Sequence, residues 1–169
     1  MKILVSILHI AIVFSVSFVC AAEEILKIVP YPQNVVIEKG YFNVAGATIR
    51  YSDIADTLTI RMFDRLADQL SLVTGNRSEV KTGKGRGINF IQDSSLAEEA
   101  YIIYIKPHRV DIKASSLRGF NWAIQTIKQM MPVQIYADVP SFDVECFLPC
   151  CSINDAPRFP YRGLHLDEA

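Results

Sequence analysis

The stretch AYIIYIKPHRVDIKA, residues 100–114, decides the fold, because two alternating apolar segments flank a short polar break. The first segment covers residues 100–106 and the second covers residues 109–114, with Pro107 and His108 between them. Alternation with a period of two is typical of half-buried β-strands, and so short a break predicts a hairpin. We therefore expect two antiparallel strands here, with His108 exposed in the turn rather than acting as a ligand.

On both sides of this hairpin the apolar period lengthens, which predicts two amphipathic helices. In residues 56–73 apolar side chains recur at four-residue steps, at Leu58, Met62, Leu66 and Leu70. Residues 117–131 carry one apolar stripe, and Pro132 ends the pattern, since a proline disfavours the helical conformation of the residue before it. Trp122 lies near that stripe, so we expect it to pack in the core.

Short extended segments account for most of the remaining chain. A second hairpin is predicted over residues 34–44, turning at Lys39-Gly40, and further extended segments are predicted over residues 47–51, 87–92, 133–136 and 143–153. The order is strands, helix, strands, helix, strands. It predicts an α+β domain with a mostly antiparallel sheet and both helices on one face.

The first 22 residues have the three parts of a secretory signal peptide. Met1-Lys2 gives a positive start, residues 3–19 are almost wholly apolar, and Cys20-Ala21-Ala22 supplies small residues for cleavage. We expect cleavage after Ala21 or Ala22 and an exported product, in the periplasm, the cell envelope or outside the cell. An uncleaved membrane anchor and lipid attachment at Cys20 are the alternatives.

Composition excludes some classes of function. Half of the 169 residues are apolar and the formal net charge is −1, which suits a globular domain rather than a disordered tail. A net charge so close to zero gives no reason to expect a nucleic-acid partner. The glycine-rich segment 81–87 matches neither common phosphate-binding pattern, so we interpret it as a solvated turn.

Metal binding has little support in the sequence. Once the signal is removed, three closely spaced cysteines remain, and adjacent Cys150 and Cys151 point to opposite faces if they lie in a strand. We interpret them, with Cys146, as small apolar residues of a β-segment. A zinc site would need further ligands, and His108 and His165 are the nearest histidines. Asn76-Arg77-Ser78 is a glycosylation sequon, relevant only in a eukaryotic secretory pathway.

The end of the chain carries the most specific pattern: Asp155, Pro157-Arg158-Phe159, Tyr161, Arg162-Gly163 and an apolar strand ending in Leu166-Asp167. This pattern resembles the start of the catalytic barrel in β-N-acetylhexosaminidases of glycoside hydrolase family 20. Residues 28–32 resemble the opening of that family after its signal. Residues 100–101, 111–114 and 119–129 resemble its non-catalytic N-terminal domain.

The resemblance implies a function for the parent enzyme. Members of this family remove terminal β-linked N-acetylglucosamine or N-acetylgalactosamine, and the substrate's own acetamido oxygen attacks the anomeric carbon. An Asp positions the acetamido group and the adjacent Glu protonates the leaving oxygen. The implied partners are glycans that contain N-acetylhexosamine and the catalytic barrel itself, with no nucleic acid, no metal and no cofactor.

By the same resemblance, none of the family's catalytic or substrate-binding residues is expected in this chain. Asp167-Glu168 stands at the end of the first barrel strand, whereas the family's Asp-Glu pair belongs to a later strand. The family's sugar-gripping arginine would follow directly after Ala169. Arg162 stands at the start of the strand, at the end of a barrel opposite to active sites, so we expect it to tie the barrel to its surroundings.

The predicted organisation has three parts. Residues 1–22 are the signal peptide, residues 23–153 the α+β domain, and residues 154–169 a truncated start of a (β/α) barrel. We expect the chain to be the N-terminal portion of an exported hexosaminidase and to be inactive alone. The alternative is a stand-alone non-catalytic carbohydrate-associated or scaffold module, but such a module should end near Ile153, whereas the sequence continues into the barrel pattern.

Overall fold

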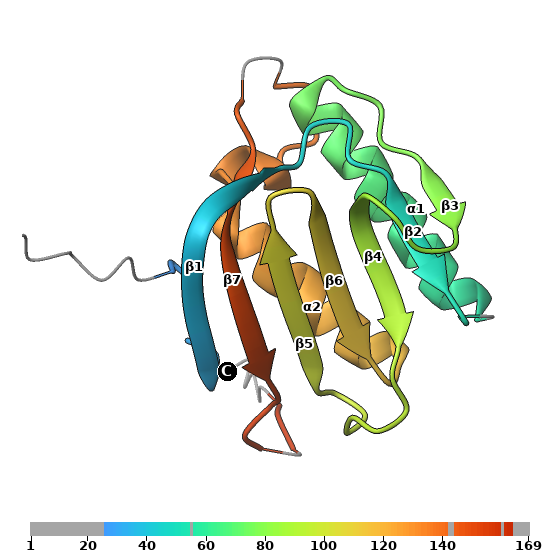
Figure 1. The fold of residues 1–169 in the computed structure, drawn as a ribbon, viewed down its shortest axis with the longest axis vertical. Helices are drawn as coiled ribbons and strands as arrows, with labels where there is room; N and C mark the ends of the chain where they lie inside the picture. The colour runs from blue at the N-terminus through green and yellow to red at the C-terminus, as the bar shows by residue number, and fades with distance from the viewer. Residues whose placement is uncertain (1–25, 55, 142–143, 160, 164–169) are drawn as a thin grey trace, which may run out of the picture.

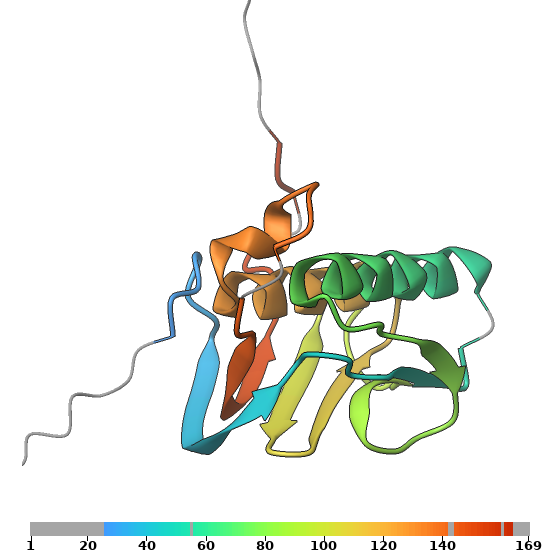
Figure 2. The ribbon, with the colours of Figure 1, turned by 90° about the horizontal axis from the view of Figure 1, so that it is seen from above.

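One seven-stranded sheet with two helices packed on one of its faces makes up the fold (Figure 1 and Figure 2). The computed structural model describes residues 26–54, 56–141, 144–159 and 161–163. The predicted signal peptide, residues 1–22, lies outside these ranges, as do Asp167 and Glu168. No helix in the described ranges is long and apolar enough to cross a membrane.

The strands follow one another across the sheet in the order β1-β7-β5-β6-β4-β2-β3. Their bounds are, in chain order, β1 Asn34–Asn43, β2 Ile49–Ser52, β3 Val80–Thr82, β4 Gly87–Gln92, β5 Tyr101–Lys106, β6 Arg109–Ala114 and β7 Phe147–Asp155. Strands β5 and β6 lie near the middle and form the hairpin predicted from the alternating pattern. Their register places Ile103 opposite Ile112, both fully buried.

The predicted hairpin over residues 34–44 is wrong, because these residues form the single strand β1. Its partner is the distant strand β7, and the register shifts between Ile37 and Tyr41. Gly40 lies in that interval with φ of +109°. A two-residue hairpin turn of the common type needs positive φ at two successive residues. Gly40 alone has it here, so the chain bulges and continues in the same direction.

The sheet is mixed. Antiparallel pairing, as predicted, holds among β1, β7, β5 and β6, whereas β6, β4, β2 and β3 pair in parallel. Helix α1 (Thr57–Thr74) leaves the end of β2 and returns the chain to the start of β3, and parallel neighbours require such a crossover. The α+β class and the placement of both helices on one face are confirmed, as Figure 2 shows.

Both predicted helices are present, and each begins at a capping side chain. The Asp56 carboxylate accepts from the backbone N–H groups of Leu58 and Thr59 at the start of α1. The Ser116 hydroxyl accepts from two backbone N–H groups at the start of α2 (Leu117–Met130). Such caps satisfy backbone donors that have no partner within the helix. Gly75, with φ of +66°, ends α1 in the left-handed conformation that glycine adopts without steric cost.

Three phenylalanines pack together between the two helices and the sheet. Phe63 of α1 stacks on Phe90 of β4 with ring centroids 4.0 Å apart, and Phe120 of α2 meets both rings edge-on. All three side chains are almost completely buried. Aromatic pairs prefer such offset and edge-to-face arrangements. The cluster therefore fixes how the two helices lie against β4, and with it the surface that they present outward.

Residues 133–136, predicted as extended, instead form the short 3₁₀ helix η1 (Val133–Tyr136). The N–H of Ile135 donates to the Pro132 carbonyl at 3.0 Å, and the Ile135 side chain is fully buried. A single tight turn is enough to place this side chain in the core.

Candidate functional site

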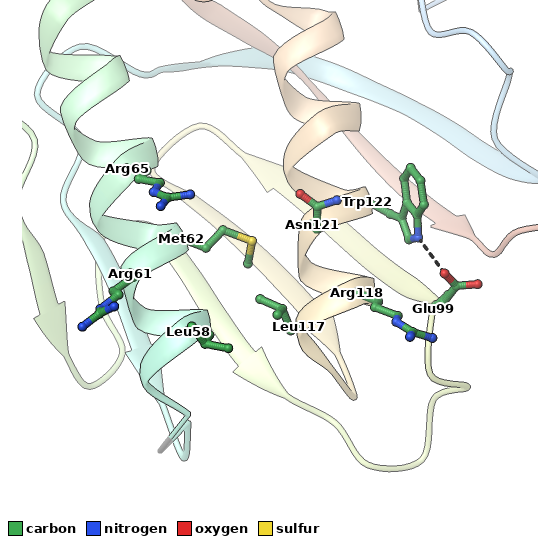
Figure 3. Close-up of a pocket in the computed structure, with 9 residues that line it drawn as sticks. All are labelled: Leu58, Arg61, Met62, Arg65, Glu99, Leu117, Arg118, Asn121 and Trp122. Atoms are coloured by element: carbon green, nitrogen blue, oxygen red, sulfur yellow. Dashed lines mark hydrogen bonds between the residues drawn. The ribbon is translucent and has the colours of Figure 1, made fainter. Parts of the chain in front are cut away.

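A hollow on the helix side of the fold lies between α1 and α2, and we call it the α1–α2 groove. It has a volume of about 550 Å³. Its lining comes from the first turns of both helices and from the loop before β5, with the sheet behind them (Figure 3). The lining residues are Leu58, Arg61, Met62, Arg65, Glu99, Leu117, Arg118, Asn121 and Trp122.

The groove follows from the way each helix divides its residues between core and surface. Helix α1 buries one stripe against the sheet, comprising Phe63, Leu66, Ala67, Leu70 and Val73. Leu58, in the first turn of α1, lies outside this stripe and keeps 61% of its surface exposed. Trp122 is 37% exposed and forms a wall of the groove, so the prediction that it packs in the core is wrong.

A bidentate ion pair closes one rim of the groove. The Arg162 guanidinium donates from Nη2 to both Glu99 oxygens, at 2.8 and 2.9 Å. It also donates from Nη1 to the Phe159 carbonyl at 2.7 Å. Trp122 Nε1 donates to Glu99 Oε1 at 3.3 Å, and the Arg162 guanidinium carbon lies 5.4 Å from the centroid of the indole ring. Arg162 was predicted to tie the start of the barrel to its surroundings, and its bonds to Glu99 agree with that prediction.

The charge state of Glu99 limits what the groove can do chemically. The hydrogen bond from Arg162 is the main cause that lowers the pKa of this carboxyl, and it outweighs the opposing effect of desolvation. Glu99 is therefore ionised at neutral pH, whereas a general acid must hold a proton there. Nearby Glu98 is ion-paired with Arg118 at 3.3 Å. Glu99 is thus not a carboxylic acid that could protonate a leaving group at neutral pH.

The groove carries excess positive charge. Arg61 and Arg65 stand four residues apart on α1, and within the described ranges neither forms an ion pair or a hydrogen bond. Guanidinium groups in this state suit carboxylates or other oxyanions, which they bind in a fork geometry.

The three remaining cysteines are buried, and none of them forms a disulfide. Cys150 and Cys151 are neighbours on β7, and burial raises the pKa of the Cys151 thiol to about 12. In the part of the chain that the structure describes, no three His, Cys, Asp or Glu side chains are placed to hold a metal ion. His108 is exposed in the β5–β6 turn, as predicted, with Nδ1 3.4 Å from Arg86 Nη2.

The glycine-rich segment 81–87 has more structure than the predicted solvated turn. Its first residues belong to β3, which pairs in parallel with β2. The rest is held by Asn89, a fully buried residue of β4. The Asn89 side chain accepts from the N–H of Gly85 at 2.9 Å and donates to the carbonyls of Gly85, Gly87 and Val110. These bonds satisfy a buried amide, so they explain the loop without a ligand.

Sequence reasoning did not single out Glu99, although it is the centre of the rim. It lies in an acidic pair just before a strand, which is a common surface pattern. The only signal was the separate prediction about Arg162, because an arginine that ties down a tail needs a carboxylate nearby.

Comparison with known proteins gives a consistent result. Residues 26–156 match the model of glycosyl hydrolase family 20, domain 2. A β-N-acetylhexosaminidase of Cellulomonas fimi is 31% identical over 76% of this chain and 25% of its own length. Subunit A1 of β-hexosaminidase from Dictyostelium discoideum is 26% identical over 87% of this chain and 28% of its own length. The chain thus spans about a quarter of the length of these curated relatives.

Solved structures show the same similarity. The N-acetyl-β-hexosaminidase of Streptomyces plicatus, in complex with Thio-NAglucal, superposes with a TM-score of 0.70 at 27% identity. A family 20 β-N-acetylhexosaminidase of Streptomyces coelicolor superposes with a TM-score of 0.71 at 26% identity. In both cases the match covers 80% of this chain and 27% of the other.

Proposed function

Because this chain belongs to glycosyl hydrolase family 20 through its domain 2, we propose that it is the non-catalytic N-terminal portion of an exported β-N-acetylhexosaminidase. The parent enzyme removes terminal β-linked N-acetylglucosamine or N-acetylgalactosamine from glycans by substrate-assisted hydrolysis. The observation that carries this proposal is the match of residues 26–156 to the family's domain 2, together with relatives of which the chain covers only about a quarter. In this proposal the catalytic Asp and Glu belong to a barrel that follows the α+β domain.

The chemistry of the described residues supports an accessory role. Glu99, which lines the α1–α2 groove, is ion-paired with Arg162, and the hydrogen bond from Arg162 lowers its pKa. Acid catalysis by a carboxyl group near neutral pH needs the opposite, a pKa raised by burial or by a neighbouring negative charge. The domain therefore supports the enzyme through its surfaces.

An activity assay tests this assignment. The 169-residue chain and a polypeptide that continues past Ala169 into the catalytic domain are compared with a fluorogenic β-N-acetylglucosaminide. We expect turnover only from the longer polypeptide, because a positioned general acid alone contributes roughly a hundred- to ten-thousand-fold in rate. Turnover by the 169-residue chain that disappears in the Asp167→Asn, Glu168→Gln variant would contradict the proposal. A reading frame that closes at Ala169 would favour the stand-alone module.

Export is part of the same proposal. The motivation is the positive, apolar and small-residue order of residues 1–22. Amino-terminal sequencing of the protein recovered outside the cytoplasm should give a chain that begins at Ala22 or Glu23. A membrane-bound product that retains Met1 would argue for an anchor instead, and a lipid found on Cys20 would argue for lipoprotein processing.

A further inference from the structure

Another pocket lies at the end of the sheet opposite to the Arg162 contacts, and we call it the sheet-end pocket. It has a volume of about 300 Å³, and its lining includes Asn43, Thr48, Arg86, Pro107 and His108. These residues come from the end of β1 and the chain after it, the residue before β4 and the β5–β6 turn, which meet at one end of the sheet in Figure 1. The whole length of β5 separates this turn from the α1–α2 groove.

The sheet-end pocket contains a guanidinium group that has no counter-ion. The Arg86 side chain is exposed, and within the described ranges its one polar contact runs from Nη2 to Nδ1 of His108, at 3.4 Å. No carboxylate is found among the described residues that line the pocket. Lys106 brings a second positive charge to the start of the turn, and it forms no ion pair with any described residue. Most donors of the guanidinium group therefore remain available to an oxyanion.

Apolar surface borders this charged part of the pocket. Phe147, the first residue of β7, lies opposite Asn43 in the β1–β7 register and keeps 43% of its surface exposed. Residues opposite each other in an antiparallel pair carry their side chains on the same face, roughly 5 Å apart, so the Phe147 ring lies beside the pocket. Pro107 adds an apolar wall. The site therefore suits a ligand that combines an oxyanion with an apolar face.

We propose that the sheet-end pocket binds an acidic sugar residue of a glycan chain. The Arg86 guanidinium receives the oxyanion, which is a sulfate or a carboxylate, and the C–H face of the sugar ring lies on Phe147. The volume of about 300 Å³ is at the small end of the range for ligand pockets, which suits a single sugar residue. The inference rests on the proposed function only in naming a glycan as the source of the anion.

The arrangement of charge favours a glycan over a nucleic acid or a free anion. Proteins that bind nucleic acids neutralise a row of phosphates with many lysines and arginines. The described lining of this pocket holds one guanidinium, and the net charge of the chain is −1. A free inorganic anion would bind Arg86 and leave Phe147 exposed to water, whereas an acidic sugar contacts both.

Binding of oligosaccharides to the 169-residue chain tests this proposal without any catalysis. The probes are fluorescently labelled hexasaccharides of chondroitin sulfate, unsulfated chondroitin and chitin, and their binding is followed by fluorescence anisotropy. They carry sulfate with carboxylate, carboxylate alone and no anion, respectively. We expect at least one acidic probe to bind roughly tenfold or more tightly than the neutral probe, because a hydrogen bond to a charged group contributes that much. A preference for chondroitin sulfate identifies sulfate as the oxyanion, and similar affinities for the two acidic probes identify the carboxylate.

Two double variants with the same change in net charge locate the binding. Arg86→Gln with Lys106→Gln should weaken binding of the acidic probe by about tenfold or more. Arg61→Gln with Arg65→Gln, on α1, should change it by less than about twofold, because distant exposed charges are screened. Phe147→Ser should weaken it by at least about threefold through the lost apolar contact.

Hydrogen exchange of the unmodified chain supplies a readout that needs no variant. The acidic hexasaccharide should slow amide exchange in residues 42–48 and 105–109 and leave exchange in α1 unchanged. Protection confined to other parts of the chain would overturn the proposal.

Several binding results would also overturn the proposal. They are equal affinity for the neutral and acidic probes, no binding of any probe, and equal losses in the two double variants. Tighter binding of duplex DNA than of either acidic hexasaccharide would assign the pocket to nucleic acid instead. Turnover by the polypeptide that continues past Ala169 is measured separately. An active longer polypeptide that fails to bind the acidic probes refutes the pocket alone, and an inactive one that binds them refutes the proposed function alone.

Discussion

The Tyr101 hydroxyl joins three elements of the fold and offers the sharpest test of its packing. It lies on β5, 2.6 Å from Thr126 Oγ1 of α2, and donates to Asp155 Oδ2 of β7 at 3.0 Å. Tyr101 is only 3% exposed and Thr126 only 6%. Since the tyrosine proton goes to Asp155, the Thr126 hydroxyl must donate to the tyrosine oxygen. Tyr101→Phe keeps the ring and removes both bonds.

The size of the effect follows from what is left behind. One hydrogen bond contributes about 0.5–1.5 kcal/mol net, and a buried polar group left without a partner costs about 1–3 kcal/mol. We expect Tyr101→Phe to lower the free energy of unfolding by about 2–3 kcal/mol. For a domain of this size that lowers Tm by roughly 5–10 °C, at about 2–4 °C per kcal/mol.

Thermal and urea unfolding of the 169-residue chain, followed by circular dichroism, measure this change. Tyr104→Phe is the matched control, because it makes the same substitution three residues along β5 at a side chain that is 39% exposed. The control should change stability by less than about 0.5 kcal/mol. Equal losses in the two variants would refute the reasoning, since the loss would then come from the phenol group in general and not from the buried bonds.

Three further predictions concern other parts of the molecule. Gly119→Ala should lower Tm, because the new Cβ would lie 2.6 Å from the Ala100 carbonyl oxygen. This clash should outweigh the helix propensity of alanine, which exceeds that of glycine by about 1 kcal/mol. A raised Tm would show that α2 has room to shift. A thiol reagent at pH 8 should label the three buried cysteines only as the chain unfolds, and rapid labelling of the folded chain would contradict this. Burial raises the pKa values of these thiols in the folded chain. Thiols exposed by unfolding therefore ionise first, and the free energy of unfolding should fall above about pH 9. When the chain is titrated with acid, the fluorescence of its single tryptophan, Trp122, should change only below pH 4.5. The reason is that the pKa of Glu99 is lowered, and the ion pair with Arg162 is lost as the pH falls through that pKa. Glu99→Gln should remove the transition, and a transition above pH 4.5 would count against the ion pair.

Local patterns predicted the helices and the central hairpin well, because their partners are near in sequence. The four-residue steps of α1 and the alternation of β5 and β6 are each decided within about 18 residues. Pairing between distant strands carries no such signal. Strand β1 was interpreted as a hairpin because its partner β7 lies about a hundred residues further on, and the parallel pairs of β4 with β2 and β6 depend on crossovers that join separate segments.

The groove was hidden from the sequence for a similar reason. Trp122 lies near the apolar stripe of α2, and the stripe alone does not show that its ring lies beside Glu99 and Arg162 instead of packing in the core. Glu99 and Arg162 are 63 residues apart, so their contact depends on where β7 returns the chain. The bonds of Arg162 to Glu99 agree with the prediction that it ties the chain to its surroundings, whereas its place at the start of a barrel strand stays a prediction.

The Arg162 contacts fix the position of residues 161–163 more than they stabilise the folded domain. The ion pair with Glu99 is partly exposed, and such pairs contribute little to folding. Its geometry is nevertheless restrictive, because the two bonds to Glu99 and the bond to the Phe159 carbonyl fix the guanidinium in its plane. Residues 161–163 are therefore held against Glu99 and Trp122. On this argument Arg162→Lys, which keeps the charge but loses the planar guanidinium, should leave Tm of the 169-residue chain unchanged while changing the fluorescence of Trp122. Loss of Tm without a change in fluorescence would show instead that Arg162 serves the fold.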